Sequence, residues 1–186
     1  NDAGQLARLD RGEQKIWFFY NPAGTAMSMK YKNLRYYYVK NMQDDVIGIA
    51  DYNGNIIARY EYDSWGKLLS ITDANGEALT EGSLAEEIAL MNPFRYRSYQ
   101  YDDETGLYYL TTRYYDPETG RFVNADGMIG SGSDLRGHNL FAYCGNNPVT
   151  FCDPTGQRRV PTLQQVMKAV ATQQRLNAKG VPAPQI

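Results

Sequence analysis

The stretch that decides the fold runs from Asn92 to Gly156 and reads NPFRYRSYQYDDETGLYYLTTRYYDPETGRFVNADGMIGSGSDLRGHNLFAYCGNNPVTFCDPTG. It contains two acidic turns with the same ending, Asp102–Gly106 and Asp116–Gly120. Each turn ends in a glycine, which can adopt the positive φ that a chain reversal needs. Leu107–Tyr115 lies between the turns and is β-branched or aromatic at most positions, so the sequence predicts a strand there.

Several short motifs follow one another in this stretch. They are Asn92-Pro93-Phe94-Arg95, Glu104-Thr105-Gly106-Leu107-Tyr108-Tyr109, Arg113-Tyr114-Tyr115-Asp116-Pro117, Gly120-Arg121-Phe122, Asn139-Leu140-Phe141-Ala142-Tyr143, Gly145-Asn146-Asn147-Pro148 and Asp153-Pro154-Thr155-Gly156. In order and spacing they closely resemble the associated core domain of Rhs (YD-repeat) proteins. The resemblance implies an all-β fold in which antiparallel hairpins spiral into a hollow shell, with the core domain closing its end.

Residues 1–76 have the pattern of repeated β-hairpins. The predicted strands are Ile16–Tyr20, Arg35–Lys40, Val46–Asp51, Ile56–Asp63 and Leu68–Thr72. Asn53-Gly54 between two apolar runs is a strong hairpin signal, and Tyr60-x-Tyr62-Asp63-x-x-Gly66 matches a YD repeat. One hairpin is too small to bury its own apolar face, so we expect neighbours to pair edge to edge in one long antiparallel sheet.

Residues 77–91 interrupt the hairpin pattern. Ser83 and Glu86 have the spacing of a capping box, which predicts a loop followed by a short helix between the repeats and the core domain at 92–156. Residues 157–186 are expected to form a cationic linker and a helical segment.

The C-terminal helix is predicted to begin at a second capping box, Thr162 and Gln165. Its apolar residues share one face, at the spacing of an amphipathic helix; they are Leu163, Val166, Met167 and Val170. Three interpretations stay open: the first turns of a variable cargo domain, a plug inside the shell, or a simple tail.

Composition limits the classes of partner. The 186 residues carry a formal net charge of −2, which implies neither a nucleic-acid nor a membrane partner, and no apolar run is long enough for a membrane helix. The chain begins at Asn1 in the middle of the repeat pattern, so we expect it to be the C-terminal piece of a longer polypeptide. Its partners would then be upstream repeats and a C-terminal cargo, and the resemblance implies a secreted or cell-surface bacterial location.

The family resemblance also implies a catalytic pair. In toxin-carrying members two aspartates of the core domain cut the chain just beyond the Asp-Pro-x-Gly motif, and those positions map to Asp102 and Asp126. The predicted cut follows Gln157, and one carboxylate would activate water while its neighbour holds the proton. The positively charged residues that would support this pair are Arg95 and Arg121.

Two departures from the family pattern count against self-cleavage. Cleaving members have Asp-Pro at the second aspartate and Leu after the final glycine, whereas this chain has Gly127 and Gln157 at those positions. The competing interpretation is structural, because aspartates in turns commonly bind their own backbone.

Other sites are weaker candidates. His138 with Cys144 or Cys152 would make a nucleophile pair, but a structural histidine is favoured, and the two cysteines are compatible with either a disulfide or free thiols. The sequence offers no phosphate loop and no metal-ligand spacing, so we expect no cofactor and no metal.

The sequence contains 16 tyrosines, and many of them fall on the predicted strands. The candidates for an exposed, glycan-binding surface are Tyr36, Tyr37, Tyr38, Tyr60, Tyr62, Tyr96, Tyr99, Tyr101, Tyr108, Tyr109, Tyr114 and Tyr115. Packing within the sheet is the favoured alternative, because cross-strand aromatic pairs stabilise ladders and alternation leaves only half of them on one face.

Three classes of function therefore remain. The favoured one is a structural segment that closes a secreted shell and encloses or presents the C-terminal region. The others are a self-cleaving aspartic peptidase and an extracellular adhesive, carbohydrate-binding module. An isolated segment would expose a sheet edge on its N-terminal side, so we also expect self-association through that edge.

Overall fold

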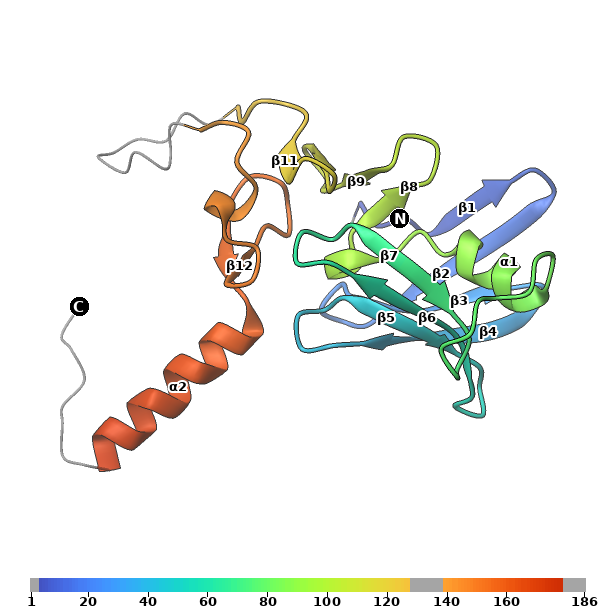
Figure 1. The fold of residues 1–186 in the computed structure, drawn as a ribbon, viewed down its shortest axis with the longest axis horizontal. Helices are drawn as coiled ribbons and strands as arrows, with labels where there is room; N and C mark the ends of the chain where they lie inside the picture. Colours follow the sequence, from blue (N-terminus) through green and yellow to red (C-terminus); the bar gives the residue numbers. More distant parts are fainter. Residues whose placement is uncertain (1–3, 128–138, 179–186) are drawn as a thin grey trace.

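The computed structural model describes residues 4–127 and 139–178, so His138 lies outside the described residues (Figure 1). Most of the fold is antiparallel β-structure, as the sequence predicts, in one large and two small sheets. Figure 1 shows the large sheet on one side of the molecule and the last part of the chain, with helix α2, projecting from the other.

The large sheet has seven strands in sequence order, each antiparallel to the next. They are β1 (Arg8–Arg11), β2 (Gln14–Tyr20), β3 (Ala26–Tyr31), β4 (Leu34–Lys40), β5 (Val46–Ala50), β6 (Ile56–Tyr62) and β7 (Leu68–Thr72). The predicted edge-to-edge pairing of hairpins is confirmed. Sequence reasoning missed β1 and β3, because their Met, Lys, Ser, Arg and Asp residues have little intrinsic strand preference and form strands by pairing with β2 and β4.

An acidic side chain closes three of the hairpin turns in the same way. Asp63 Oδ1 accepts hydrogen bonds from the backbone N–H groups of Trp65 and Lys67, at 2.8 and 2.9 Å, and Gly66 takes φ +89°. Asp51 and Asp73 bind the residues two and four positions ahead with the same geometry. The recurring aspartates and glycines of the sequence therefore mark the turns because they satisfy the backbone of each reversal.

One face of the sheet packs on helix α1 (Leu84–Met91). Ile88 and Ala89 of α1 are fully buried in a core of strand residues, which are Ile16, Phe18, Ala26, Met29, Tyr31, Tyr36, Tyr38, Val46, Ile49, Ala58 and Tyr60. The predicted helix start is confirmed at Ser83, whose hydroxyl accepts from the backbone N–H of Glu86 at 3.2 Å. The Glu86 carboxylate binds the N–H of Gly82 at 2.7 Å, one residue earlier than a capping box requires.

The second sheet has four strands in the order β11-β10-β9-β8. They are β8 (Gln100–Asp102), β9 (Leu107–Tyr109), β10 (Tyr114–Asp116) and β11 (Arg121–Phe122), and the short 3-10 helix η1 (Tyr96–Ser98) precedes them. The prediction of one strand over Leu107–Tyr115 is wrong. The chain reverses after Leu110, where Thr111 takes φ +70°, and β9 pairs with β10 as a hairpin.

Tyrosine hydroxyls join the two sheets at the β6–β7 turn. Tyr96, Tyr115 and Tyr108 donate to the carbonyls of the successive residues Ser64, Trp65 and Gly66, at 2.9, 2.6 and 2.9 Å. Their rings belong to the second core, which consists of Tyr96, Tyr99, Tyr108, Leu110, Tyr115, Phe122, Tyr143 and Cys144. The β6–β7 turn of the large sheet is thus hydrogen-bonded to the core of the second sheet.

The last described part of the chain has only short strands and one helix. The 3-10 helix η3 (Tyr143–Asn146) leads to a two-stranded sheet of β12 (Phe151–Cys152) and β13 (Val160–Pro161), and α2 (Leu163–Ala178) follows. The expected linker is therefore partly a strand. The helix is confirmed, but its predicted cap is wrong, because the Thr162 hydroxyl is buried without a hydrogen-bond partner. None of the helices among the described residues is long and apolar enough to span a membrane.

Replacing Gly66 by alanine tests the joint between the sheets. An added Cβ would lie 2.4 Å from the Tyr96 ring, whereas the same atom at Gly54 meets nothing within 4 Å, although both glycines have φ near +90°. We expect Gly54→Ala to lower the free energy of unfolding by about 1–2 kcal/mol, and Gly66→Ala to add a steric cost of roughly 1–3 kcal/mol. Urea unfolding of the two variants measures this difference, and equal midpoints would contradict it.

Candidate functional site

A buried arginine organises the region where the chain leaves the second core. Arg113 follows the tight turn at Thr111 and comes directly before β10, with 6% of its surface exposed. Its guanidinium carbon lies 3.5 Å from the centroid of the Phe122 ring. It donates one hydrogen bond from Nη1 to the Leu140 carbonyl at 3.1 Å and another from Nε to the Gly156 carbonyl. The Arg113 side chain therefore binds two segments of backbone that are distant in sequence.

Two carboxylates meet on this arginine. Asp126 Oδ2 lies 3.2 Å and Asp153 Oδ2 lies 3.4 Å from the same nitrogen, Nη2 of Arg113. The Asp153 side chain is 3% exposed and that of Asp126 is 19% exposed. Burying a guanidinium is costly unless it is paired and hydrogen-bonded, so these oxygens offset the cost for Arg113.

Asp153 also holds the chain that follows it. Its Oδ1 accepts hydrogen bonds from the backbone N–H groups of Gln157 and Arg158, both at 3.1 Å, and its own N–H donates to the Tyr99 hydroxyl at 3.1 Å. Gly156 has φ +74°, and an added Cβ there would lie 2.8 Å from the Leu110 carbonyl oxygen. The Asp-Pro-x-Gly motif is therefore a closed turn that only glycine can complete at this position.

The segment after this turn is held as well. Phe151 and Cys152 of β12 pair with Pro161 and Val160 of β13, and the Thr162 N–H donates to the Thr150 carbonyl at 2.9 Å. Beyond Thr162 the chain packs less closely on the rest of the protein. The four apolar residues predicted to share one face of α2 are each about half exposed.

A cavity of about 420 Å³ opens beside the turn. Its lining includes Arg113, Asn124, Asp126, Gly156 and Gln157. The carboxylate of Asp126 and the residue before the predicted cleavage bond thus share one cavity.

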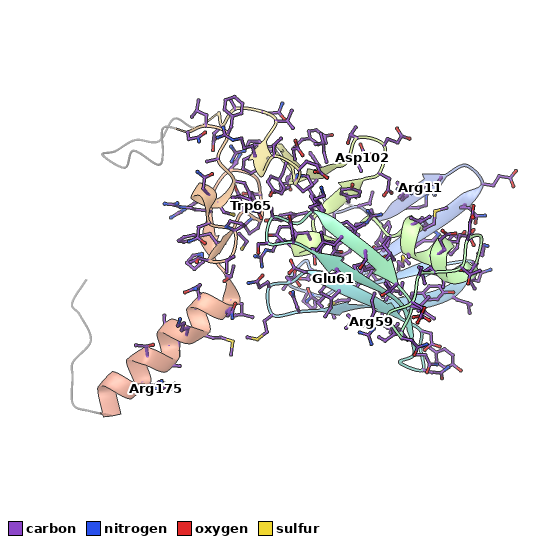
Figure 2. The ribbon with its side chains drawn as sticks, viewed as in Figure 1. Arg11, Arg59, Glu61, Trp65, Asp102 and Arg175 are labelled. Atoms are coloured by element: carbon purple, nitrogen blue, oxygen red, sulfur yellow. The ribbon has the colours of Figure 1, made fainter. Side chains whose placement is uncertain are left out.

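The structure does not bring Asp102 and Asp126 together. Asp102 lies opposite Leu107 at one end of β9, whereas Arg113, which binds Asp126, lies beyond the other end of β9. In addition, β8 and β11 are the two edges of the four-stranded sheet, three spacings apart, which is roughly 14 Å. In Figure 2 Asp102 lies on the side of Arg11, well away from the C-terminal part of the chain.

Asp102 has a turn-forming role instead. Its Oδ1 accepts from the Glu104 N–H at 3.1 Å and its Oδ2 from the Thr105 hydroxyl at 2.8 Å. Asp116 binds Glu118 and Thr119 in the same way in the matching turn. This geometry favours the structural interpretation of Asp102.

The two arginines expected to support the catalytic pair lie elsewhere. Arg95 is 2% exposed, binds the Asp103 carboxylate at 2.7 Å and stacks over the Tyr101 ring at 4.3 Å. Arg121 lies opposite Asp116 on β11. Sequence reasoning quoted Arg113 and Asp153 within motifs but gave neither a role. The available signal was a cationic residue within a run of strand-forming aromatics, where a charge needs buried partners.

The nucleophile hypothesis pairs a cysteine with His138, which lies outside the described residues. Both cysteines are free thiols, and burial raises the pKa of Cys144 to about 12 and also raises that of Cys152, which disfavours the thiolate. Across residues 4–127 and 139–178, no group of three Cys, His, Asp or Glu side chains has a metal-binding arrangement.

Most tyrosines pack inside the protein rather than forming a ladder. Among the candidates for a binding surface, the buried ones are Tyr36, Tyr38, Tyr60, Tyr96, Tyr99, Tyr108 and Tyr115, and Tyr62 and Tyr101 are half-buried. Only Tyr37, Tyr109 and Tyr114 are exposed, each by about two fifths. The packing interpretation therefore accounts for most of the set.

Comparisons with known proteins agree with this architecture. The family model described as the teneurin YD-shell matches residues 9–149. Among curated proteins, the chain is 39% identical over 139 residues to the tRNA nuclease WapA of Bacillus subtilis, covering 75% of this chain and 5% of WapA. It is 35% identical over 107 residues to the toxin protein Tse5 of Pseudomonas aeruginosa, covering 54% of this chain and 8% of Tse5.

Solved structures show the same fold. The structure described as TcdB2-TccC3-Cdc42 matches with a TM-score of 0.60 and 25% identity, covering 77% of this chain and 6% of the matched chain. The Photorhabdus luminescens Tc holotoxin pore with a TccC3 mutation matches with a TM-score of 0.58 and 25% identity, covering 80% of this chain and 6% of that one. The chain thus spans less than a tenth of the length of these relatives.

The hairpin sheet, its tyrosine-lined second core and the family match over most of its length give one conclusion: this chain belongs to the YD-shell family of Rhs/YD-repeat proteins.

Proposed function

We propose that this segment closes the end of a YD-repeat shell and fixes the point at which the C-terminal region leaves it. The observation that carries the proposal is the closed turn at Asp153, which binds two backbone N–H groups while Arg113 binds the Gly156 carbonyl. The chain is fixed here by charged, buried groups, although almost every residue after Thr162 whose burial the structure describes is exposed. A fixed turn at Asp153 followed by a loosely held segment suits a shell wall that presents or encloses the C-terminal region.

The seven-stranded sheet supplies the wall in this proposal. The described residues leave the outer edge of β1 without a strand partner, so the ladder can be extended by further hairpins of the same kind. Upstream YD repeats are the natural partners for this edge, and a toxin-like C-terminal region is the cargo suggested by the relatives. Secretion or surface display fits the same relatives and belongs to this proposal.

Self-cleavage after Gln157 is a second candidate function. One observation favours it: Asp126 lines the same cavity as Gly156 and Gln157. Asp126 and Asp153 both bind Nη2 of Arg113. The carboxylate that shares this contact with Asp126 is therefore that of Asp153 and not that of Asp102. Arg113 lies between these two carboxylates, so cleavage by this pair would require Arg113 to move away.

Trypsin digestion of an Asp153→Ala variant tests the fixed exit. In the wild-type protein we expect cuts in α2, after Lys168 or Arg175, to precede cuts after Arg158 or Arg159, because Asp153 and β13 hold the latter. Loss of two hydrogen bonds to a charged group should speed the cut after Arg158 or Arg159 by about tenfold. Mass spectrometry of timed samples gives both rates.

The rate of cutting in α2 is the internal control, since that helix does not contact Asp153 in the described structure. Asp153→Asn, which retains an oxygen acceptor, should give an intermediate rate. An unchanged order of cuts in Asp153→Ala would refute the role assigned to this turn.

An Asp10→Pro variant tests the free edge of the sheet. The Phe18 N–H donates to the Ala7 carbonyl at 3.0 Å, so alternation along β1 directs the N–H of Asp10 away from β2. Proline there leaves the β1–β2 ladder intact but blocks an incoming strand. Analytical ultracentrifugation should show association of the wild-type protein and of Asp10→Asn, and a monomer for Asp10→Pro. A monodisperse wild-type monomer would contradict association through this edge.

Self-cleavage is tested by intact mass after expression. If this activity is present, the wild-type protein gives a fragment that ends at Gln157, and Asp126→Asn gives only the full chain. Asp102→Asn should cleave like the wild type, because Asp102 is at the far end of the second sheet. The absence of any fragment ending at Gln157 in the wild-type protein would eliminate the activity for this chain.

A further inference from the structure

Residues 73–91, which include α1, carry charge of one sign. They contain no Lys or Arg, and their acidic residues are Asp73, Glu77, Glu81, Glu86 and Glu87. Glu87 pairs with Lys32 at 2.6 Å. Glu77 and Glu81 are exposed and have no ion pair among the described residues. We call residues 73–91 the acidic segment, and it keeps two carboxylates available for a partner.

The acidic segment also exposes apolar side chains. Leu84 and Leu90 of α1 are 47% and 45% exposed, although Ile88 and Ala89 of the same helix are fully buried. Each of these leucines is three positions from Glu87, so apolar and acidic side chains are neighbours on the outward side of α1. A partner that fits this surface needs both apolar and cationic groups.

Residues 157–178, which include α2, carry the opposite charge. They contain no Asp or Glu, and their basic residues are Arg158, Arg159, Lys168 and Arg175. Lys168 and Arg175 are two turns apart, so both project from one side of α2 (Figure 2). Neither has an ion pair within the described structure. We call residues 157–178 the basic segment; its unpaired cations and half-exposed apolar face complement the acidic segment.

The two segments of one molecule do not meet. In Figure 1 α1 and α2 lie on opposite sides of the molecule. The Thr162 N–H donates to the Thr150 carbonyl at 2.9 Å directly before α2, so the start of the helix is held in place. From this point the 16 residues of α2 extend about 24 Å, away from the large sheet. The acidic segment is therefore accessible to the basic segment of another molecule rather than to its own.

We propose that the basic segment of one copy of this chain docks on the acidic segment of a second copy. The apolar face of α2 packs against Leu84 and Leu90. The two unpaired cations of α2 pair with the two unpaired carboxylates, Glu77 and Glu81. Contacts between two α2 helices or between two α1 helices are disfavoured, because each would bring like charges together. An anionic lipid surface fits less well, since it complements α2 alone and repels the acidic segment.

This contact is head to tail, and it is small. Each copy offers α1 to one neighbour and α2 to another, so the copies form a ring or an open chain. The eight residues of α1 span about 12 Å, which is too short for the area that a permanent complex buries. The association is therefore weak, and salt weakens it further.

Charge exchange between the two segments tests the contact. The experiment uses Asp10→Pro, in which the edge of β1 is blocked, and analytical ultracentrifugation at higher protein concentration and lower salt than the edge test. In dilute solution the contact is too weak to hold copies together. We expect Asp10→Pro to associate only under the concentrated, low-salt conditions and to dissociate when salt is added.

Two double variants in the Asp10→Pro background each reverse the charge of one segment, Lys168→Glu/Arg175→Glu and Glu77→Lys/Glu81→Lys. Each should lower the association constant by about tenfold or more, because two attractions become repulsions. Combining all four substitutions exchanges the charges of the segments and restores the net charge of Asp10→Pro. The combined variant should associate as Asp10→Pro does, and mixing the two double variants should restore association as well.

The matched control is Glu61→Lys/Glu104→Lys in the same background. It changes the net charge as Glu77→Lys/Glu81→Lys does, but Glu61 alternates on β6 with buried Tyr60 and faces away from α1, and Glu104 is in the β8–β9 turn. It should associate like Asp10→Pro, and far-UV circular dichroism checks that every variant is folded.

Three results would overturn the proposal: an equal loss in the control pair, no recovery in the combined variant, or a monomer of Asp10→Pro at every concentration. Vesicles of phosphatidylglycerol provide the last comparison. If Asp10→Pro stays monomeric but binds these vesicles, and Lys168→Glu/Arg175→Glu abolishes that binding, an anionic lipid surface replaces the second copy as the partner of α2.

Discussion

Three tyrosine hydroxyls on one turn fix the relative positions of the two main sheets. Tyr96, Tyr108 and Tyr115 all donate to the β6–β7 turn, so a loop that would otherwise expose its carbonyls becomes part of the core. Burial raises the pKa of all three phenols, to about 12 for Tyr96, so they stay protonated and remain donors at neutral pH. Phenylalanine would fill the same space but leave these carbonyls unpaired.

Buried arginines perform a related task in the second core. Arg97 donates to the carbonyls of Gln43 and Pro148 at 3.0 and 2.6 Å, which ties the β4–β5 hairpin to the segment before β12. Arg113 ties Leu140 and Gly156 together from the second sheet. Each guanidinium offers several donors in a fixed plane, so a small core with short strands gains specific connections between segments far apart in sequence. The desolvation cost explains why each of these arginines also has a carboxylate.

The wall and the exit have different physical character, and the proposed function uses both. Among the described residues the outer edge of β1 has no strand partner, so in the proposed function further hairpins extend the large sheet by repeating the same ladder. In the proposed function the exit has to stop the ladder and direct the chain outward, so its backbone cannot follow the same regular pairing. At that point the side chains of Arg113 and Asp153 bind the backbone, in place of the hydrogen bonds between strands.

The sequence by itself determined the hairpin turns, the position of α1 and the amphipathic character of α2. Those features depend on neighbours within a few residues, such as the aspartate that binds backbone N–H groups two and four positions ahead. It did not determine β1 and β3, the break at Thr111 or the pairing of Arg113 with Asp126 and Asp153. These depend on contacts between distant segments: a strand of weak propensity forms because its neighbours supply the ladder, and a carboxylate finds its partner only when two sheets are packed together. Asp102 and Asp126 carried the same motif-level signal, and only the tertiary structure put them at opposite ends of one sheet.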